Sequence, residues 1–260
     1  MNQQRVVEMP HKSGHERLTF GTIRLSEGDT KSCLDQIAYS GKNGMNHVYH
    51  LVNSYTCTIF FESSETNPLT LVNSKNLIDG FWLRKYLELK TKGKVSATRG
   101  PNLFESAFTP ELPLGKRHLL LGSTHDILDA LETEIGKKTL NEAEVFKISP
   151  PFRELSDQEM DELVTSISSF GPDVIWVGLG TPKQDLFSHK ISDRVAVPLV
   201  CVGAAFDFMS NNKKTAPIFM QRIGLEWLFR LASEPRRLWK RYLYGNLKFA
   251  TLAWKDLLSK

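Results

Sequence analysis

Residues 173–185 read DVIWVGLGTPKQD, an apolar run that ends in two closely spaced glycines and continues into a polar segment. A short apolar run bounded by turn signals is typical of a strand buried inside a parallel sheet. Gly178 and Gly180 permit a tight turn after this strand and a close approach of the backbone to a ligand. We therefore expect both glycines to lie in a substrate-binding site.

A helix is predicted to begin directly after this turn. Thr181 suits the N-cap, Pro182 the first helical position, and Gln184 the place of a capping-box partner. The free N–H groups of such a helix end attract a diphosphate. The segment lacks the third glycine of the dinucleotide motif and the GK[ST] ending of a Walker loop. A plain strand-to-helix turn without a ligand stays the alternative for this motif alone.

Similar strand-then-helix patterns recur along the chain. Strands separated by helices require crossover connections, which favour a mostly parallel sheet with helices on both faces. We therefore predict an α/β, Rossmann-like fold. One helix start is especially clear, because Ser156 and Glu159 form a capping box that opens the segment 157–170. The other predicted strands are HVYHLVN (47–53), RHLLLG (117–122), EVFKIS (144–149) and PLVCVG (198–203).

Three polar residues follow other predicted strand ends, where ligands bind in open α/β sheets. Asp207 closes GAAFD (203–207), and either holds the adjoining loop or contacts the ligand. Asp79 lies in LIDGFWL at an apparent strand-to-helix junction, and Asn53 ends the first strand. Taken alone, Asp79 fits the role of a turn or cap residue better than that of a site residue, and Asn53 has a similar alternative as a turn residue.

The last part of the chain is strongly basic. Residues 213–260 contain 11 Lys or Arg against 3 acidic residues, whereas the whole chain carries a net charge of only +4. Residues 1–212 are therefore predicted to form the α/β core, and residues 213–260 a basic helical appendage suited to phosphates or an anionic surface. A solvated basic face over an ordinary core stripe is the alternative.

Apolar residues of this appendage recur at three- and four-residue steps, which predicts one amphipathic helix followed by a second after Pro235. The apolar positions are Ile218, Phe219, Ile223, Trp227, Leu228 and Leu231.

Composition limits the remaining classes. No apolar run approaches the ~20 residues that span a bilayer, and the polar start lacks a secretory signal, so we expect a cytoplasmic protein. Cys33, Cys57 and Cys201 are widely spaced and are interpreted as buried thiols. No Asp-x-Asp motif is present, so we expect neither a metal held by paired carboxylates nor a cofactor.

Three motifs together, VGLGTPKQD, GAAFDF and APIFMQRIGLEWLFRLASEPRRLWKRYL, closely resemble the WecG/TagA/CpsF family of bacterial glycosyltransferases, glycosyltransferase family 26. The resemblance is dense over residues 117–246 and thinner upstream. It implies an inverting, metal-independent enzyme that transfers an N-acetylmannosamine-type sugar from a UDP donor. The implied acceptor is an undecaprenyl-diphosphate-linked sugar, in the synthesis of cell-surface polysaccharide or teichoic acid.

The resemblance also implies roles for particular residues. Asp79 takes the place of the family's general base, and Asn53 and Gln184 the places of donor-binding residues. Arg230 and Arg237 best match the arginines that reach the donor diphosphate. A third arginine of the family falls near Lys240 and Arg241, and the sequence does not choose between them.

Two departures from the family pattern lie upstream. Leu51 stands where the family usually has threonine, and Ala97 where it commonly has arginine, with Arg99 nearby. Another UDP-hexose or UDP-hexuronic acid donor, or an inactive UDP-sugar-binding relative, therefore stays open.

The basic tail and the family resemblance also predict what the protein binds. We expect the basic tail to dock on the anionic inner face of the cell membrane, so that the protein is peripherally associated with it. A nucleic-acid-binding module is the competing class for a basic tail, but no DNA or RNA motif accompanies it, so we expect no nucleic acid. A homo-oligomer is compatible with the sequence.

Overall fold

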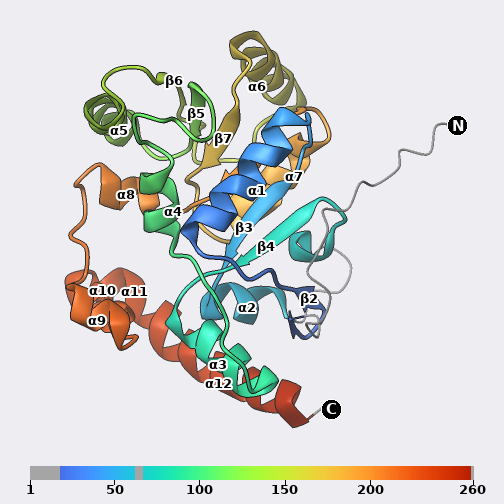
Figure 1. Ribbon diagram of the computed structural model, residues 1–260, viewed down its shortest axis with the longest axis vertical. Coiled ribbons are helices and arrows are strands. Elements are labelled where there is room, and N and C mark those ends of the chain that lie inside the picture. Colours follow the sequence, from blue (N-terminus) through green and yellow to red (C-terminus); the bar gives the residue numbers. More distant parts are fainter. Residues whose placement is uncertain (1–17, 62–66, 259–260) are drawn as a thin grey trace, which may run out of the picture.

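The computed structural model describes residues 18–61 and 67–258, so the polar start on which the signal-peptide expectation depended lies outside the described residues. Its centre is a six-stranded sheet in which every neighbouring pair is parallel (Figure 1). In spatial order the strands are β4 (Ser74–Ile78), β3 (Val48–Val52), β8 (Leu199–Cys201), β7 (Val174–Val177), β5 (Arg117–Leu121) and β6 (Glu144–Ile148).

Helices cover both faces of this sheet, which confirms the predicted Rossmann-like α/β class. One buried cluster joins the sheet to α1 (Thr30–Lys42), α4 (Gly100–Ser106), α5 (His125–Lys138) and α8 (Ala205–Met209). A second cluster joins the opposite face to α6 (Asp157–Phe170) and α7 (Lys183–Ser192).

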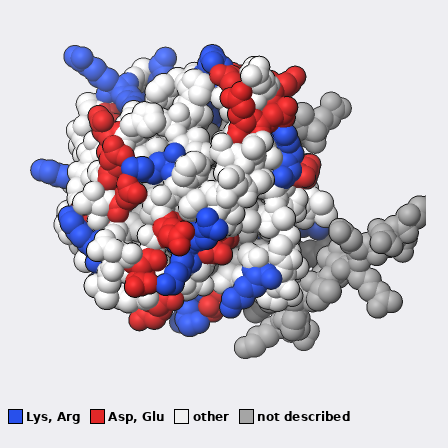
Figure 2. Space-filling model, turned by 90° about the horizontal axis from the view of Figure 1, so that it is seen from above, with Lys and Arg blue, Asp and Glu red and all other residues white. Residues whose placement is uncertain are grey.

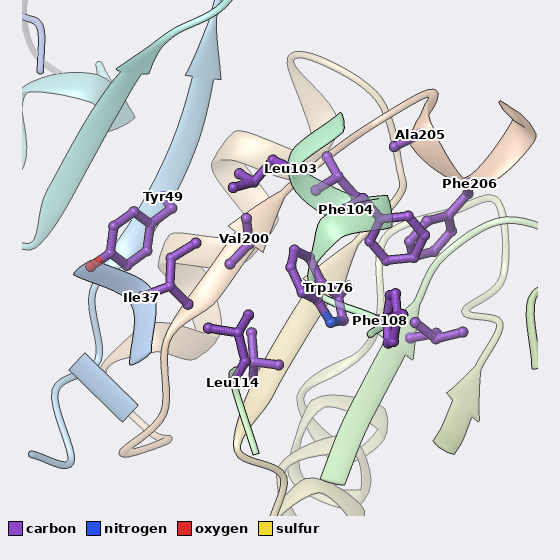
Figure 3. Close-up of a cluster of buried hydrophobic side chains, with 14 of the residues drawn as sticks. Ile37, Tyr49, Leu103, Phe104, Phe108, Leu114, Trp176, Val200, Ala205 and Phe206 are labelled. Carbon is purple, nitrogen blue, oxygen red and sulfur yellow. The ribbon is translucent and has the colours of Figure 1, made fainter. Parts of the chain in front are cut away.

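Trp176 of β7 lies at the centre of the first cluster (Figure 3). Its ring contacts Phe104 edge to face, with the ring centroids 5.0 Å apart. Its indole Nε1 donates to His118 Nδ1 at 3.1 Å, so this buried tryptophan has a partner for its polar atom. Phe206, also in this cluster, lies in the first turn of α8, which follows β8, so the aromatic packing joins the segment after β8 to β7.

The third buried cluster lies beside the carboxyl ends of β3 and β4. It contains side chains of α2 (Ser54–Phe60), α3 (Phe81–Thr91) and α12 (Gly245–Leu258). The short hairpin of β1 (Thr19–Phe20) and β2 (Ile23–Arg24) packs into it. A 3₁₀ turn, η1 (Pro68–Thr70), precedes β4.

The predicted strands and the Ser156–Glu159 capping box are confirmed, but the start of α7 is different from the prediction. The helix begins at Lys183, Pro182 is its N-cap, and no side chain caps it. Gln184 turns back instead, and its Oε1 accepts a hydrogen bond from the Gly180 N–H at 3.0 Å. The Gln184 N–H, which the predicted cap would have placed on Thr181, donates to the Gly180 carbonyl at 2.9 Å.

The tail is helical, but the prediction of one helix before Pro235 was wrong. The chain breaks at Gly224, whose φ of +77° is left-handed and whose Cβ, if present, would lie 2.3 Å from the Phe81 ring. Helical spacing of apolar residues does not show such a break, because Gly224 falls between the apolar positions. The tail elements are α9 (Ile218–Arg222), α10 (Glu226–Ser233), α11 (Pro235–Trp239), the π-helical turn η2 (Lys240–Tyr244) and α12.

The surface and the thiols agree with the composition. Figure 2, seen from the end opposite α12, shows basic and acidic side chains interspersed, as a near-neutral body requires. Cys33, Cys57 and Cys201 are all buried and unpaired, as predicted. Among the described residues, no helix combines the length and the apolar character that crossing a bilayer requires.

Candidate active site

A cavity of about 450 Å³ lies at the carboxyl ends of the central strands, between the α/β core and the tail. Its wall contains residues that follow the ends of four strands. Asn53 and Asp79 come directly after β3 and β4, and Gly180 and Gly203 lie in the turns after β7 and β8. The tail closes the opposite side. Five of the residues predicted to form the site, Asn53, Asp79, Gly180, Gln184 and Arg230, line this one cavity.

Asp79 is held by backbone pairing at the end of β4. Its N–H donates to the Val52 carbonyl at 2.8 Å, and Thr98 forms a parallel bridge with it. Asn53 Nδ2 lies 3.4 Å from Asp79 Oδ2. Burial raises the pKa of the Asp79 carboxyl to about 6, and the nearby Glu226 adds to the rise, whereas the contact with Asn53 opposes it. Such a carboxylate is a competent proton acceptor near neutral pH.

Asn53 has a structural role as well as a place in the cavity. Its Oδ1 accepts from the N–H groups of Tyr55 and Thr56 at 3.1 and 3.2 Å, and so caps α2. Asn53 can therefore cap α2 and also belong to the site, because capping with Oδ1 turns its amide nitrogen toward Asp79.

The two glycines of the 173–185 segment have different surroundings. A Cβ on Gly178 would lie 2.4 Å from the Phe206 ring, so this glycine serves packing and does not line the cavity. Gly180 has a φ of +77° and nothing within 4 Å of an added Cβ, which leaves open space above its backbone. Gly180 and Gln184 thus form the part of this turn that a ligand can reach.

Arg230 and Arg241 enter the cavity wall from the tail. The Arg230 guanidinium lies 5.3 Å from the centroid of the Phe208 ring, and that of Arg241 lies 4.1 Å from the centroid of the Tyr55 ring. Burial lowers the pKa of Arg241, and the positive charge of Arg230 lowers it further. The sequence did not choose between Lys240 and Arg241 as the third basic residue of the family pattern. In the structure Arg241 lines the cavity, whereas Lys240 packs over Trp239.

Besides Gly178, two other predicted site residues do not line the cavity, Arg237 and Asp207. Arg237 is 54% exposed and pairs with Glu234, 2.5 Å away. Asp207 accepts from Asn212 and forms an ion pair with Lys213 at 2.8 Å, so it holds the adjoining loop, one of its two predicted roles.

Sequence reasoning missed the groups that join the core to the tail. Arg99 donates to Gln221 at 2.7 Å and to Glu226 at 2.9 Å. Trp82 Nε1 donates to the Gly224 carbonyl at 3.1 Å. The only sequence signal was the proximity of Arg99 to the position where the family has its arginine.

The described part of the cavity wall is rich in positive charge. Five arginines and two carboxylates line it. Arg241 Nε and Trp227 Nε1 are buried without a hydrogen-bond partner among the described residues. Buried donors are normally satisfied, so these two are suited to a ligand with several acceptor oxygens. The arginines are Arg84, Arg99, Arg222, Arg230 and Arg241, and the carboxylates are Asp79 and Glu226.

The sequence profile of the WecG/TagA/CpsF glycosyl transferase family matches residues 18–260, which includes every element of the cavity. The chain belongs to this family. Curated relatives agree with the match. The N-acetylglucosaminyldiphosphoundecaprenol N-acetyl-beta-D-mannosaminyltransferase of Bacillus spizizenii is 33% identical over 172 residues, which cover 64% of this chain and 63% of the relative.

Two further WecG/TagA/CpsF-type relatives carry the same enzyme name. The Bacillus subtilis protein is 28% identical over 176 residues, 66% of each chain. The Staphylococcus aureus protein is 25% identical over 213 residues, 73% of this chain and 79% of the relative. The match to the first two relatives therefore spans slightly less than two thirds of their length.

Proposed function

We propose that this chain is an inverting glycosyltransferase that moves an N-acetylmannosamine-type sugar from a UDP donor to an undecaprenyl-diphosphate-linked sugar. The observation that carries the proposal is the shared cavity. A carboxylate with a raised pKa, Asp79, and two tail guanidiniums, Arg230 and Arg241, line the same space. Family membership and the names of the relatives support the substrate classes.

Asp79 is proposed as the general base. It accepts the proton of the acceptor hydroxyl while the oxygen attacks the anomeric carbon, and the bond from that carbon to the UDP oxygen breaks. A single displacement of this kind inverts the anomeric centre. Positioned bases contribute about 10²–10⁴-fold to such reactions. Asn53, 3.4 Å from Asp79 Oδ2, is placed to orient the carboxylate.

Arg230 and Arg241 are proposed to bind the donor diphosphate. The departing UDP gains negative charge in the transition state, and fixed guanidiniums in a partly buried wall stabilise that charge. They supply the role that a divalent cation has in other transferases, so we propose transfer without a catalytic metal. Gly180 and Gln184 lie on the core side of the same cavity and are proposed to contact the donor.

The tail is proposed to dock the protein on the anionic membrane face where its lipid-linked acceptor resides. The exposed tail aromatics Trp239 and Trp254 are 49% and 65% exposed, and suit the headgroup region. Trp227 has a different place, since it lines the cavity. Further exposed apolar side chains of the tail are Ile218, Phe219, Ile223, Leu228, Leu243, Tyr244, Leu247 and Leu258.

Another donor sugar is the second candidate, because both departures from the family pattern line the cavity. Leu51 and Ala97 lie in its wall and present apolar groups there. A Cβ on Gly100 would approach Leu51 to 2.9 Å, so this leucine fills the space beneath α4. A UDP-hexose or UDP-hexuronic acid donor is therefore the alternative to N-acetylmannosamine.

The test is UDP release with a short lipid-diphosphate-N-acetylglucosamine acceptor and a panel of UDP-sugars. We expect release with UDP-N-acetylmannosamine, its loss in Asp79→Asn, and its retention in Asp126→Asn, which changes an exposed carboxylate on α5. Release with a different UDP-sugar alone would select the second candidate. No release with any donor, combined with calorimetric binding of UDP, would identify an inactive relative.

A further inference from the structure

A buried polar cluster lies between the sheet and α7, on the core side of the cavity. It is formed by His50 of β3, Asp185 in the first turn of α7, and Cys201 of β8. Their exposed fractions are 0%, 1% and 0%, and one ligand atom from each lies within 4.8 Å of the others. Sequence spacing hides this cluster, because its members lie far apart in the chain.

The hydrogen bonds within the cluster leave it incomplete. His50 Nδ1 lies 2.7 Å from Asp185 Oδ1, but Asp185 Oδ2 is buried without a partner among the described residues. Cys201 Sγ has only weak contacts, 3.2 Å from Ser188 Oγ and 3.7 Å from the Gln184 carbonyl. A carboxylate oxygen removed from water without a partner is costly, and a bound cation offsets that cost.

We propose that His50, Asp185 and Cys201 bind a zinc ion. Imidazole nitrogen, carboxylate oxygen and thiolate sulfur are the three donor types that Zn²⁺ takes in proteins, usually four in a tetrahedron. Ser188 Oγ, beside Cys201 Sγ, is placed to complete the set. Binding displaces the proton between His50 and Asp185 and the proton of the thiol, and both pass to solvent.

The surroundings of His50 fit a metal ligand. Ligating histidines are normally fixed by a hydrogen bond from the second ring nitrogen. With Nδ1 on the ion, His50 Nε2–H faces His189 Nε2 at 3.1 Å, and the two rings stack with centroids 5.2 Å apart. His189 Nε2 also lies 3.1 Å from Ser74 Oγ, so the two imidazoles and this hydroxyl form one polar network beside the cluster.

The ion would link three elements beneath the cavity. His50 precedes Asn53 by three residues, Asp185 follows Gln184, and Cys201 precedes Gly203 by two. Cys201 itself lines the cavity, and Asp185 directly follows the wall residue Gln184. The expectation of no metal is revised to a structural ion that takes no part in the transfer.

The experiment uses the full chain without a histidine tag, produced in zinc-containing medium and dialysed against metal-free buffer. Metal content is measured by inductively coupled plasma mass spectrometry. We expect about one zinc ion per chain in the wild type and in Cys57→Ser, and its loss in Cys201→Ser. Cys57 is the matched control, because it is an equally buried thiol on α2 outside the cluster.

Cobalt provides the second readout, which does not depend on how well a variant folds. Co²⁺ added to zinc-free wild type should give the sulfur-to-cobalt charge-transfer band and the intense visible bands of tetrahedral coordination. Wild-type protein that carries no zinc and shows neither band would overturn the proposal, whatever its transferase activity. Zinc retained at full stoichiometry in a folded Cys201→Ser variant would overturn it too.

Discussion

Arg99, at the start of α4, donates to Glu226 Oε1 of α10 at 2.9 Å and thereby joins the α/β core to the tail across the mouth of the cavity. Both residues also act on Asp79, since the carboxylate of Glu226 raises the pKa of Asp79 and the guanidinium of Arg99 lowers it. The link that closes the cavity therefore tunes the proposed base.

Glu226→Gln should shift the acidic limb of kcat/KM to lower pH. The wild-type limb is expected near pH 6, the pKa of Asp79, because only the ionised carboxylate accepts a proton. Loss of the Glu226 charge favours ionisation, and we expect a shift of roughly 0.3–1 pH unit. Arg99→Gln should move the limb the other way. pH–rate profiles of the three proteins decide the matter, and identical limbs would exclude the coupling.

Asp79→Asn should lose activity and gain stability at pH 8. The pKa of this carboxyl rises from 3.8 to about 6 on folding, so the folded state binds more protons than the unfolded state between these pH values. The carboxyl therefore lowers the free energy of unfolding progressively as the pH increases from about 4 to 6. Allowing for partial exposure, we expect the variant to be about 1–2 kcal/mol more stable at pH 8 and unchanged at pH 3. Urea unfolding at both pH values measures this, and equal gains at both would contradict it.

Arg241→Ala should reduce kcat/KM by about 10²-fold, because it removes a partly buried guanidinium from the cavity wall. Arg237→Ala is the matched control in the same tail, and its exposed side chain should matter little in comparison. Steady-state kinetics with the accepted donor test the pair. A larger loss of kcat/KM in Arg237→Ala than in Arg241→Ala would indicate that Arg237 binds the diphosphate.

Trp239→Ala with Trp254→Ala should weaken binding to vesicles that contain anionic lipid, because both indoles are exposed on the basic tail. Phe152→Ala removes an 88% exposed aromatic outside the tail and should leave binding unchanged. Sedimentation with anionic and neutral vesicles provides the measurement. Equal loss in both proteins would argue against a specific docking face.

Much of the fold was predictable because each buried strand is a short apolar run that ends at a turn. The same logic brought Asn53, Asp79 and Gly180 to one edge of the sheet. What it could not supply depends on contacts between distant segments. Gly224, where the helix breaks, packs closely against the Phe81 ring, and Arg241 reaches the cavity from the π-helical turn of the tail.

The cluster of His50, Asp185 and Cys201 shows the same limit. Periodicity places His50 within a buried strand, but only the order β4-β3-β8 brings it beside Cys201. The periodicity of apolar residues therefore predicts whether a side chain is buried, but not which residues of other strands it contacts.

The stacked pair of Phe20 and Phe249, with ring centroids 5.4 Å apart, joins the first described hairpin to the last helix. During synthesis on the ribosome, α12 emerges from the exit tunnel long after the hairpin. Phe20 therefore lacks this packing partner until α12 has been synthesised, and the cluster between them can form only after the tail has emerged.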